Sequence, residues 1–398
     1  MTDIAQAPAD LPTIAPDCVS LDELAAARRQ SWAAQSTRGL EVLRFREGLV
    51  ALDHPDLEKG ASFKRRLDDV GIVSGKIRDD WNRMLVTTEG AHRHHLRTPL
   101  AALFRGSQVN KLKRAIRAIV DQVLDEIPDP TAVDFMRDVA WKIPPRVYCH
   151  LVSAPIEDAP LVARLSDSTL APILTADVSR RQESIDAFNA TCDFVRDHLD
   201  QRRRQGDLDD DFTSLMIRQQ QEGLQTEEEL IFEGAALLQA SVDNTVHQIG
   251  LTFGTLLEES SRWQSVREQE KMIPPAVEEV MRMRPRFGTI FRYAVRDTEL
   301  EGAAVPADSW VFVSVRSANR DETMFNDPDM FRLDRRIGRA LQFGAGPYNC
   351  LGQTLARLEL HEVLRAVRER FPAIALTGEW TRHDSNAVTE TTRLHVAL

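Results

Sequence analysis

Hydrophobic residues recur every three to four positions along much of the chain, which is the period of a helix with one buried face. Before the main helical region, Ser20 and Glu23 have the spacing of a capping box and predict a helix over 21–35. Further on, Pro274 suits the first turn of a helix that ends at Pro285. The strongest helical periods lie at 108–126, 136–151, 180–204 and 226–259. The pattern predicts a mainly α-helical protein.

Shorter apolar runs predict a small β portion. Residues 60–83 show no regular period and predict a long loop. Residues 1–19 are expected to form a flexible lead-in, and no repeat or linker divides 20–398, which we expect to be one domain. The predicted strands lie at 40–45, 48–52, 289–294 and 310–315, with short strands and turns in 374–398.

Composition narrows the possible functions. The chain has 398 residues, and its net charge of -11 argues against nucleic-acid binding as the main activity. It contains no apolar run of about eighteen residues, and its start is rich in Pro, Ala and acidic residues, so we expect neither a membrane anchor nor a signal peptide. The four cysteines are far apart in the sequence, which favours a reducing cytoplasm over a disulfide framework or a zinc site.

One stretch is chemically distinctive. Residues 343–352 have the sequence FGAGPYNCLG, with glycines and a proline around Cys350, and an amphipathic helix is predicted to follow. A cysteine beside a glycine turn is usually structural. The full spacing Phe-Gly-x-Gly-x-x-x-Cys-x-Gly before a helix instead favours a thiolate that is stabilised by the helix dipole and ligates a planar cofactor. Haem iron is the obvious candidate.

This stretch resembles the haem-thiolate loop of the cytochrome P450 monooxygenases. The resemblance implies the P450 fold, a mainly α single domain with haem b buried between distal and proximal helices. It also implies that Cys350 is the axial ligand of the haem iron, and that Phe343, Gly344, Gly346 and Gly352 shape the loop against the haem. Other motifs of the family occur in matching order within residues 20–398.

Two of these motifs concern the haem propionates. Arg292 begins an Arg-x-Ala-x-x-Asp pattern that resembles the family strand whose arginine pairs with a propionate, a task that suits the two-pronged guanidinium. On an early helix, the family's His-x-x-x-Arg aligns Arg97 with the arginine but puts Arg93, next to His92, in the place of the histidine. Tyr348 stands where the cysteine loop usually has His or Arg. The resemblance therefore assigns propionate binding mainly to Arg97 and Arg292.

A polar segment within 226–259 resembles the distal helix of the family, whose acid–alcohol pair supplies the protons for O–O cleavage. Ala240 and Asp243 match the family pattern, and Ser241 replaces its glycine. Asn244 stands where the proton-relay threonine is usual, and Thr245 matches only the second threonine. An amide can hold a water molecule but is a poor acid. The hypothesis is that Asp243 governs proton supply and Asn244 orients water or substrate, while a substrate hydroxyl or carboxyl completing the relay stays open.

Glu279 and Arg282 lie three residues apart on a predicted helix, and such a pair is usually a surface pair of small energetic effect. The resemblance instead places them in a buried ion network with Arg335, from the segment that precedes the cysteine loop. This network would fix the proximal side of the fold, so these residues are expected to be structural.

The resemblance implies a monooxygenase that inserts one oxygen atom from O2 into a small or medium organic substrate, by hydroxylation or O-dealkylation. Lys64 to Arg66 leave open either a carboxylate on the substrate or simply solvated charge. Oxidative coupling or another non-hydroxylating oxidation also stays open, as does a non-enzymatic haem sensor. The residues expected to contact the substrate are Ile72, Ile77, Leu174, Leu237, Ser241, Thr289, Ile290 and Val388.

The chain has no room for a flavin or reductase segment, so electrons from NAD(P)H are expected to arrive through a separate ferredoxin and ferredoxin reductase. Arg332, Arg336, Arg339 and Arg357, around the cysteine loop, suggest a basic surface that attracts an acidic ferredoxin. The resemblance is to the soluble bacterial class of the family, which implies a cytoplasmic enzyme without a membrane or nucleic-acid partner.

Overall fold

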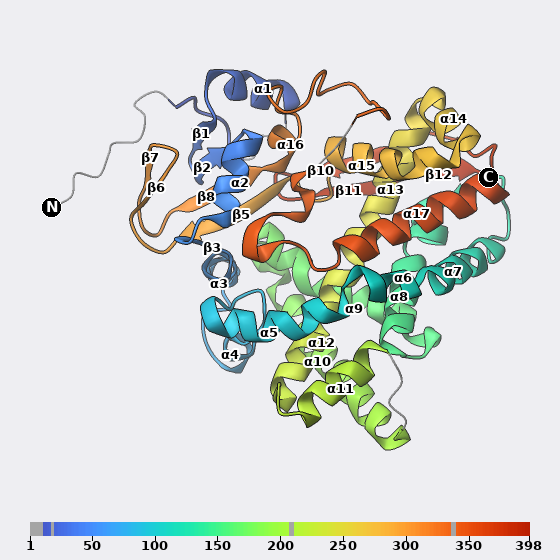
Figure 1. The fold of residues 1–398 in the computed structure, drawn as a ribbon, viewed down its shortest axis with the longest axis horizontal. Helices are drawn as coiled ribbons and strands as arrows, with labels where there is room; N and C mark the ends of the chain where they lie inside the picture. The colour runs from blue at the N-terminus through green and yellow to red at the C-terminus, as the bar shows by residue number, and fades with distance from the viewer. Residues whose placement is uncertain (1–10, 17–19, 207–210, 336–339) are drawn as a thin grey trace. The chain divides into compact units, whose positions relative to one another are not determined.

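The structure, a computed structural model, describes residues 11–16, 20–206, 211–335 and 340–398. The chain is mainly helical, as predicted, and its helices and strands are labelled in Figure 1. It divides into two compact units, each formed from separate stretches of sequence. Unit 1 comprises 1–62, 251–350 and 381–392, and unit 2 comprises 63–250, 351–380 and 393–398.

Unit 1 is organised on a five-stranded sheet with the strand order β1-β2-β8-β5-β3. Strand β8 pairs in parallel with β2 and antiparallel with β5, so that Phe312 lies opposite both Glu41 and Phe291. Two short hairpins, β6–β7 and β10–β11, complete its strands among the described residues. The strands are β1 (Ala33–Ser36), β2 (Gly39–Val42), β3 (Leu57–Glu58), β5 (Thr289–Ala294), β6 (Thr298–Leu300), β7 (Ala303–Val305), β8 (Trp310–Ser314), β10 (Thr381–Asp384) and β11 (Thr389–Arg393).

Helix α2 packs against the sheet of unit 1. Val42 and Val313 of the sheet pack with Leu52 of α2 and Leu341 of the cysteine-loop region in one buried hydrophobic cluster. The helices are α1 (Leu21–Gln30), α2 (Phe45–Asp53), α14 (Ser260–Glu268), α15 (Ile273–Met283) and α16 (Val315–Ala318). Helix α3 (Lys59–Asp69) begins in unit 1 and continues into unit 2, and α13 (Asp243–Glu258) runs from unit 2 into unit 1.

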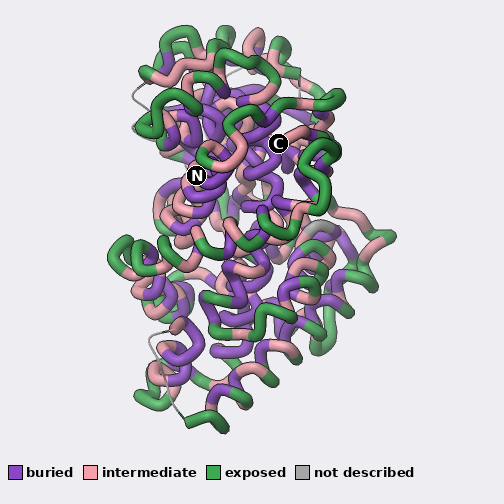
Figure 2. The backbone as a smooth tube through the Cα atoms, turned by 90° about the vertical axis from the view of Figure 1, so that its right-hand side faces the viewer, coloured by how far each residue is buried: buried purple, intermediate pink, exposed green. Residues whose placement is uncertain are grey.

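Unit 2 consists mostly of amphipathic helices. In α7 the buried residues are Ile116, Ile119, Val120, Val123 and Leu124, the spacing of a single helical face. Figure 2 shows buried and exposed stretches alternating along such helices. The helices are α4 (Lys76–Asn82), α5 (Gly90–Leu103), α6 (Gly106–Lys111), α7 (Lys113–Asp125), α8 (Ile143–Val152), α9 (Ala159–Thr175), α10 (Arg181–Gln205), α11 (Phe212–Gln221), α12 (Glu227–Ser241) and α17 (Gln353–Arg370). A sheet with the order β4-β12-β9 joins β4 (Val133–Asp134), β12 (His395–Ala397) and β9 (Ala375–Leu376).

Several sequence predictions of secondary structure were wrong. The strand predicted at 48–52 is part of α2, which buries Phe45, Gly48, Ala51 and Leu52 on one face; a short apolar run does not distinguish a strand from a buried helix. The loop predicted over 60–83 contains α3 and α4. The helix predicted over 21–35 ends at Gln30, after which β1 begins.

Two further expectations concern the flexible lead-in over 1–19 and the absence of a membrane anchor. Within the predicted lead-in, residues 1–10 and 17–19 lie outside the described residues, while the backbone N–H of Ile14 donates to the carbonyl of Gln35 at 3.0 Å. Among the described residues, no helix combines the length and the apolar character needed to cross a membrane.

Candidate active site

The cysteine loop has a tightly fixed backbone. Gly344 and Gly346 have φ of 69° and 64°, values that favour glycine, and a Cβ on Gly346 would lie 2.5 Å from the Asp53 carboxylate. The N–H of Cys350 donates to the carbonyl of Phe343 at 2.9 Å, which closes the loop. Gly352 directly precedes α17. The loop therefore presents its cysteine from a defined position.

Cys350 differs in its surroundings from the other described cysteines. Its side chain is exposed, whereas burial raises the pKa of Cys149 and of Cys192 to about 12. Cys18 lies outside the described residues. A thiol must lose its proton to ligate a metal, and a buried thiol in apolar surroundings resists this. Among the described cysteines, only Cys350 suits the role of iron ligand.

Arg292 on β5 lies beside the cysteine loop. It is 1% exposed, and its guanidinium carbon lies 4.7 Å from the ring centroid of Tyr348, two residues before Cys350. One guanidinium nitrogen, Nη2, donates to the carbonyl of Leu52 at 3.3 Å. The arrangement holds a positive charge next to the loop and gives Tyr348, which replaces the usual basic residue, a stacking role.

Glu279, Arg282 and Arg335 lie together in unit 1. Arg282 donates from Nε and Nη2 to the two carboxylate oxygens of Glu279, both at 2.8 Å, and neither side chain is exposed. Nε of Arg335 donates to Oε1 of Glu279 at 3.3 Å. The other nitrogens of the two arginines donate to backbone carbonyls between 319 and 330, including those of Pro328 and Asn326. Because every charge has a partner, this buried network can hold 326–335 against α15.

The predicted basic surface is only partly described. The Arg332 guanidinium pairs with Asp327 and Asp334, at 2.9 and 3.0 Å, so local acids offset its charge. Arg336 and Arg339 lie outside the described residues. Arg357 on α17 is half-buried and donates to the carbonyl of Gln353 at 3.3 Å.

The early helix with the predicted propionate ligands is α5. Arg93 is buried and donates to the carbonyl of Leu85, so it supports the preceding turn, while His92 is exposed and Arg97 is half-buried. His95, which the sequence pattern did not single out, lies 3.3 Å from Glu229 at the start of α12. No group of three or more His, Cys, Asp or Glu side chains among the described residues is arranged to hold a metal ion.

The distal-helix motif lies at a break between two helices. Helix α12 ends at Ser241 and α13 begins at Asp243, with Val242 at φ -105° and ψ -73° between them. Ser241 Oγ donates to the carbonyl of Leu237 at 2.6 Å, and the N–H of Asp243 donates to Ser166 Oγ at 3.4 Å. In an unbroken helix, the side chains of 243 and 244 would follow the same helical period as those of α12. The break changes the direction in which Asp243 and Asn244 project.

The exposure of this motif differs from that of its neighbours. Ala240 is exposed although Gln239 and Val242 are buried, and Asn244 is half-buried. Thr245 is 7% exposed, and its N–H donates to the carbonyl of Val242 at 3.1 Å. A small exposed side chain beside buried neighbours leaves room for close approach by a flat group. In unit 1, the exposed thiol of Cys350 is a donor of the kind that ligates haem iron.

The predicted substrate contacts fall in both units. In unit 2, Ile72 and Leu237 are buried and Ile77, Leu174 and Ser241 are half-buried. In unit 1, Thr289 and Val388 are buried and Ile290 is half-buried. The bridge between Phe287 and Val388 joins the 385–388 turn to the segment just before β5, so the structure brings the three unit 1 residues into one region.

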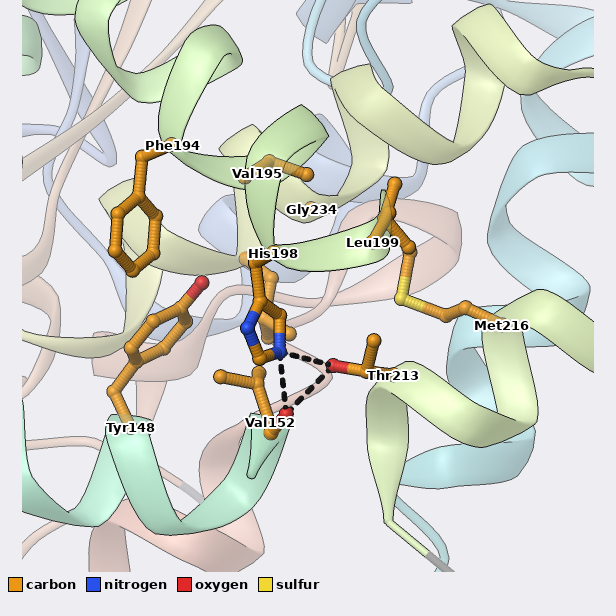
Figure 3. A pocket seen from close by; sticks show the side chains of 10 residues that line it. Tyr148, Val152, Phe194, Val195, His198, Leu199, Thr213, Met216 and Gly234 are labelled. Carbon is orange, nitrogen blue, oxygen red and sulfur yellow. Dashed lines mark hydrogen bonds between the residues drawn. The ribbon is translucent and has the colours of Figure 1, made fainter. Parts of the chain in front are cut away.

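Unit 2 also contains a small cavity, of about 20 Å³, which Figure 3 shows from close by. Helices α8, α10, α11 and α12 line it, and Leu237 is its only lining residue among the predicted substrate contacts. Its volume holds about one water molecule, far less than the roughly 300 Å³ or more of a typical ligand pocket. This cavity is therefore not the substrate site.

Besides His95, the structure adds two residues that the motifs did not identify. His247 faces Asp243 across one turn of α13, at 3.2 Å, and its spacing of four residues was a signal available in the sequence. Arg316 donates hydrogen bonds to the β10–β11 hairpin. No local sequence pattern predicts this contact, because its partners lie about seventy residues away along the chain.

Known proteins of one family resemble this chain over most of its length. The family model described as cytochrome P450 matches residues 156–379. Luteothin monooxygenase of Streptomyces thioluteus is 31% identical over 91% of this chain and 89% of its own length. The 6-deoxyerythronolide B hydroxylase of Saccharopolyspora erythraea is 30% identical over 75% of this chain and 73% of its own length.

The fold shows the same relationship. The P450 enzyme CxnD, described as forming a C–S bond in chuangxinmycin biosynthesis, has 24% identity and a TM-score of 0.87, covering 98% of both chains. The exposed cysteine in its glycine loop, the buried Glu–Arg–Arg network and the broken distal helix are thus found in a chain whose relatives are named monooxygenases and hydroxylases. The chain belongs to the cytochrome P450 family and is a P450 monooxygenase, a class of enzyme that uses haem and O2.

Proposed function

We propose that this protein hydroxylates or O-dealkylates a small or medium apolar molecule, with the Cys350 thiolate as axial ligand of haem b. The observation that supports this most directly is the exposed side chain of Cys350, in a loop whose backbone is fixed by Gly344, Gly346 and the bond to Phe343. Bound haem supplies the activation of O2, and the thiolate donates electron density to the iron. Residues 20–398 act as one P450 domain in this proposal.

The arginines hold the haem carboxylates in this proposal. Arg292, beside the cysteine loop, and Arg97 on α5 bind the propionates, and His92 is a further donor from the same helix. Arg93 serves instead to support the turn before α5, because its guanidinium is buried against Leu85. Tyr348 fixes the Arg292 side chain by stacking.

The residues at the distal break handle protons and water. Asp243 governs the supply of protons, since it is the acid at the break and is only partly exposed. Asn244 orients a water molecule or the substrate through its amide, and the Thr245 hydroxyl lies one position further along. An amide does not release a proton near neutral pH, so the acid is the group that exchanges protons with solvent.

An uncharged substrate is favoured over a carboxylate. Arg65 and Arg66 both lie near the Asp69 carboxylate, at 3.5 and 4.0 Å, so their charges already have an acidic partner. The predicted contact residues are mainly aliphatic. Such a surface selects by shape and apolar area.

Electrons come from NAD(P)H through a ferredoxin and its reductase in this proposal, as the resemblance of the sequence to the soluble bacterial class of the family implies. Arg357 remains a candidate for the docking surface, while Arg332 contributes little net charge beside Asp327 and Asp334. We place the protein in the cytoplasm, as its separated cysteines suggest.

A second candidate function is a non-hydroxylating oxidation such as oxidative coupling. Asn244 in the place of the proton-relay threonine favours it, because coupling of two substrate positions does not require insertion of an oxygen atom into the product. If no product, including any aldehyde that is released, carries oxygen from labelled O2, this candidate is selected.

The ferrous–carbon monoxide difference spectrum of the wild type and of Cys350→Ala tests the proposed function. We expect the strongly red-shifted Soret band typical of a thiolate ligand in the wild type and its loss in the variant. Cys149→Ala is the matched control, since it removes a buried thiol and should keep the band. A wild type without haem, or a spectrum that Cys350→Ala leaves unchanged, would refute the ligand assignment.

A further inference from the structure

Arg316, in α16, is 7% exposed and points its guanidinium into the β10–β11 hairpin. Its Nη2 donates to Oγ1 of Thr389 at 2.7 Å, to the carbonyl of Ser385 at 2.8 Å and to Oδ1 of Asp384 at 3.2 Å. These acceptors come from the end of β10, the turn and the start of β11. The Arg316 guanidinium therefore links both strands of the hairpin and the turn between them.

The same turn is joined by backbone hydrogen bonds to the segment before β5. The N–H of Gly288 donates to the carbonyl of Ala387 at 2.9 Å, and the N–H of Thr389 donates to that of Arg286 at 2.8 Å. The N–H of Arg316 donates to the carbonyl of Gly288 at 3.2 Å. Arg316 thus sits where the hairpin, the segment before β5 and α16 meet.

Residue 288 is a glycine, which leaves room for the Arg316 side chain where these segments meet. A Cβ on Gly288 would lie 2.6 Å from Nε of Arg316 and 3.2 Å from the carbonyl oxygen of Asn386. A glycine allows the guanidinium to pass between the two segments. A larger residue would have to displace either the arginine or the turn.

We propose that Arg316 is a positioning residue that fixes the 385–388 turn, and with it Val388, against Thr289 and Ile290. It thereby determines which apolar substrates are accepted. The inference rests on the proposed function, which assigns these three residues to the substrate contact. A two-stranded hairpin of four- and five-residue strands is only marginally stable alone, so its position depends on such an anchor. A lysine does not replace the planar, longer guanidinium here.

Variants Arg316→Lys and Thr389→Val test the anchor from both sides. Arg382→Gln is the matched control, because Arg382 bonds Asp384 at 3.1 Å from two residues away in the same strand, so this bond does not tie the hairpin to α16. Hydrogen exchange of peptides covering 385–392 measures how firmly the turn is held. The dissociation constants for imidazole and 4-phenylimidazole measure how the site selects ligands by size. We expect exchange at least about tenfold faster and a ratio of the two constants changed at least about fivefold in both variants, with the control unchanged.

Unchanged exchange would overturn the anchor, and faster exchange with an unchanged azole ratio would overturn the effect on specificity. If Arg316→Lys does not fold, Thr389→Val decides, since it removes one acceptor and keeps the arginine. A wild type that binds no haem would show failure of the proposed function through the azole measurement, while hydrogen exchange would still test the anchor.

An independent observation concerns the cavity in Figure 3. Tyr148 is 3% exposed, and its hydroxyl has no hydrogen-bond partner among the described residues. Nε2 of His198 lies 2.8 Å from the carbonyl of Val152, which can only accept, so the ring proton is on Nε2 and Nδ1 is an acceptor. In Figure 3 the Tyr148 hydroxyl and the Nδ1 edge of His198 face each other.

We propose that this cavity binds one water molecule, which accepts from the Tyr148 hydroxyl and donates to His198 Nδ1. The volume of about 20 Å³ suits one water, and a buried hydroxyl without a partner is costly. A crystal structure of the full chain, with and without xenon, tests the site. We expect a water peak bonded to both groups in the wild type and its loss or displacement in Tyr148→Phe. A dry cavity, or one that takes xenon in the wild type, would overturn the proposal.

Discussion

Oδ1 of Asp243 lies 3.2 Å from Nε2 of His247, one turn further along α13. The His247 ring packs edge-on against Trp141, with centroids 5.7 Å apart, and its Nδ1 is buried without a hydrogen-bond partner among the described residues. The imidazole is therefore held in place by packing. The acid at the helix break thus has a fixed imidazole as its partner.

We expect Asp243→Asn to lower product formation at least about tenfold, because general acid–base groups typically contribute a hundredfold or more. His247→Leu should lower product formation less, because it removes the imidazole but leaves the Asp243 carboxylate in place. His247→Gln should retain most activity because its amide can still donate a hydrogen bond to that carboxylate. The measurement is product formed per NAD(P)H oxidised, with peroxide release recorded. Equal coupling in all three variants would contradict the role of the pair.

Asn244→Thr is expected to raise the fraction of NAD(P)H that yields product, about twofold or more, because a hydroxyl can both accept and donate a proton in a relay. Asn244→Ala, which removes the amide without adding a hydroxyl, is the matched control and should lower this fraction. The same coupling assay measures both. If Thr and Ala behave alike, Asn244 does not orient the water or substrate that takes part in proton transfer.

Glu279→Gln should destabilise the fold by about 3–5 kcal/mol, because it leaves the buried Arg282 charge without its counter-ion. Urea unfolding monitored by far-UV circular dichroism measures this loss. Arg332→Gln is the control: it removes an arginine from the same segment, but one whose ion pairs are exposed, so the midpoint should stay unchanged. A wild-type midpoint in Glu279→Gln would show that the network does not support the fold.

Glu233→Gln should stabilise the protein increasingly as the pH rises. Burial raises the pKa of Glu233 in α12 from 4.5 to about 8, although Gln225 donates to its carboxyl group. The unfolded chain releases this proton above about pH 4.5 while the folded chain retains it up to about pH 8, so the wild type loses stability across that window. The amide of the variant does not titrate. Its advantage should therefore grow by up to about 4 kcal/mol between pH 5 and pH 8.

Urea unfolding of both proteins at pH 5 and pH 8 measures this change. Glu227→Gln on the same helix is the control: the partner of its carboxylate is Arg203, at 2.5 Å, and an arginine keeps its charge at both pH values. Its substitution should therefore change stability by nearly the same amount at each pH. A pH-independent effect of Glu233→Gln would show that this carboxyl group is ionised in the folded protein.

The sequence identified those parts of the site that depend on local spacing. The glycines around Cys350 lie within a few residues of it, so their positive φ angles and the fixed loop are properties of one short segment. Glu279 and Arg282 meet because three residues place them on the same helical face. Strand β5 and its Arg292 were likewise predicted from a single run of residues.

The tertiary structure decided what depends on distant partners. Residues 60–83 form α3 and α4, where Trp81 is buried in a stack with Phe188 of α10, more than a hundred residues away. The end of α12 at Ser241 has no proline or glycine to announce it. The anchoring of the 385–388 turn by Arg316 joins segments about seventy residues apart. Side-chain periodicity and motif spacing report only neighbours along the chain, whereas helix ends, buried aromatic stacks and long-range hydrogen bonds are selected by packing, which no local pattern contains.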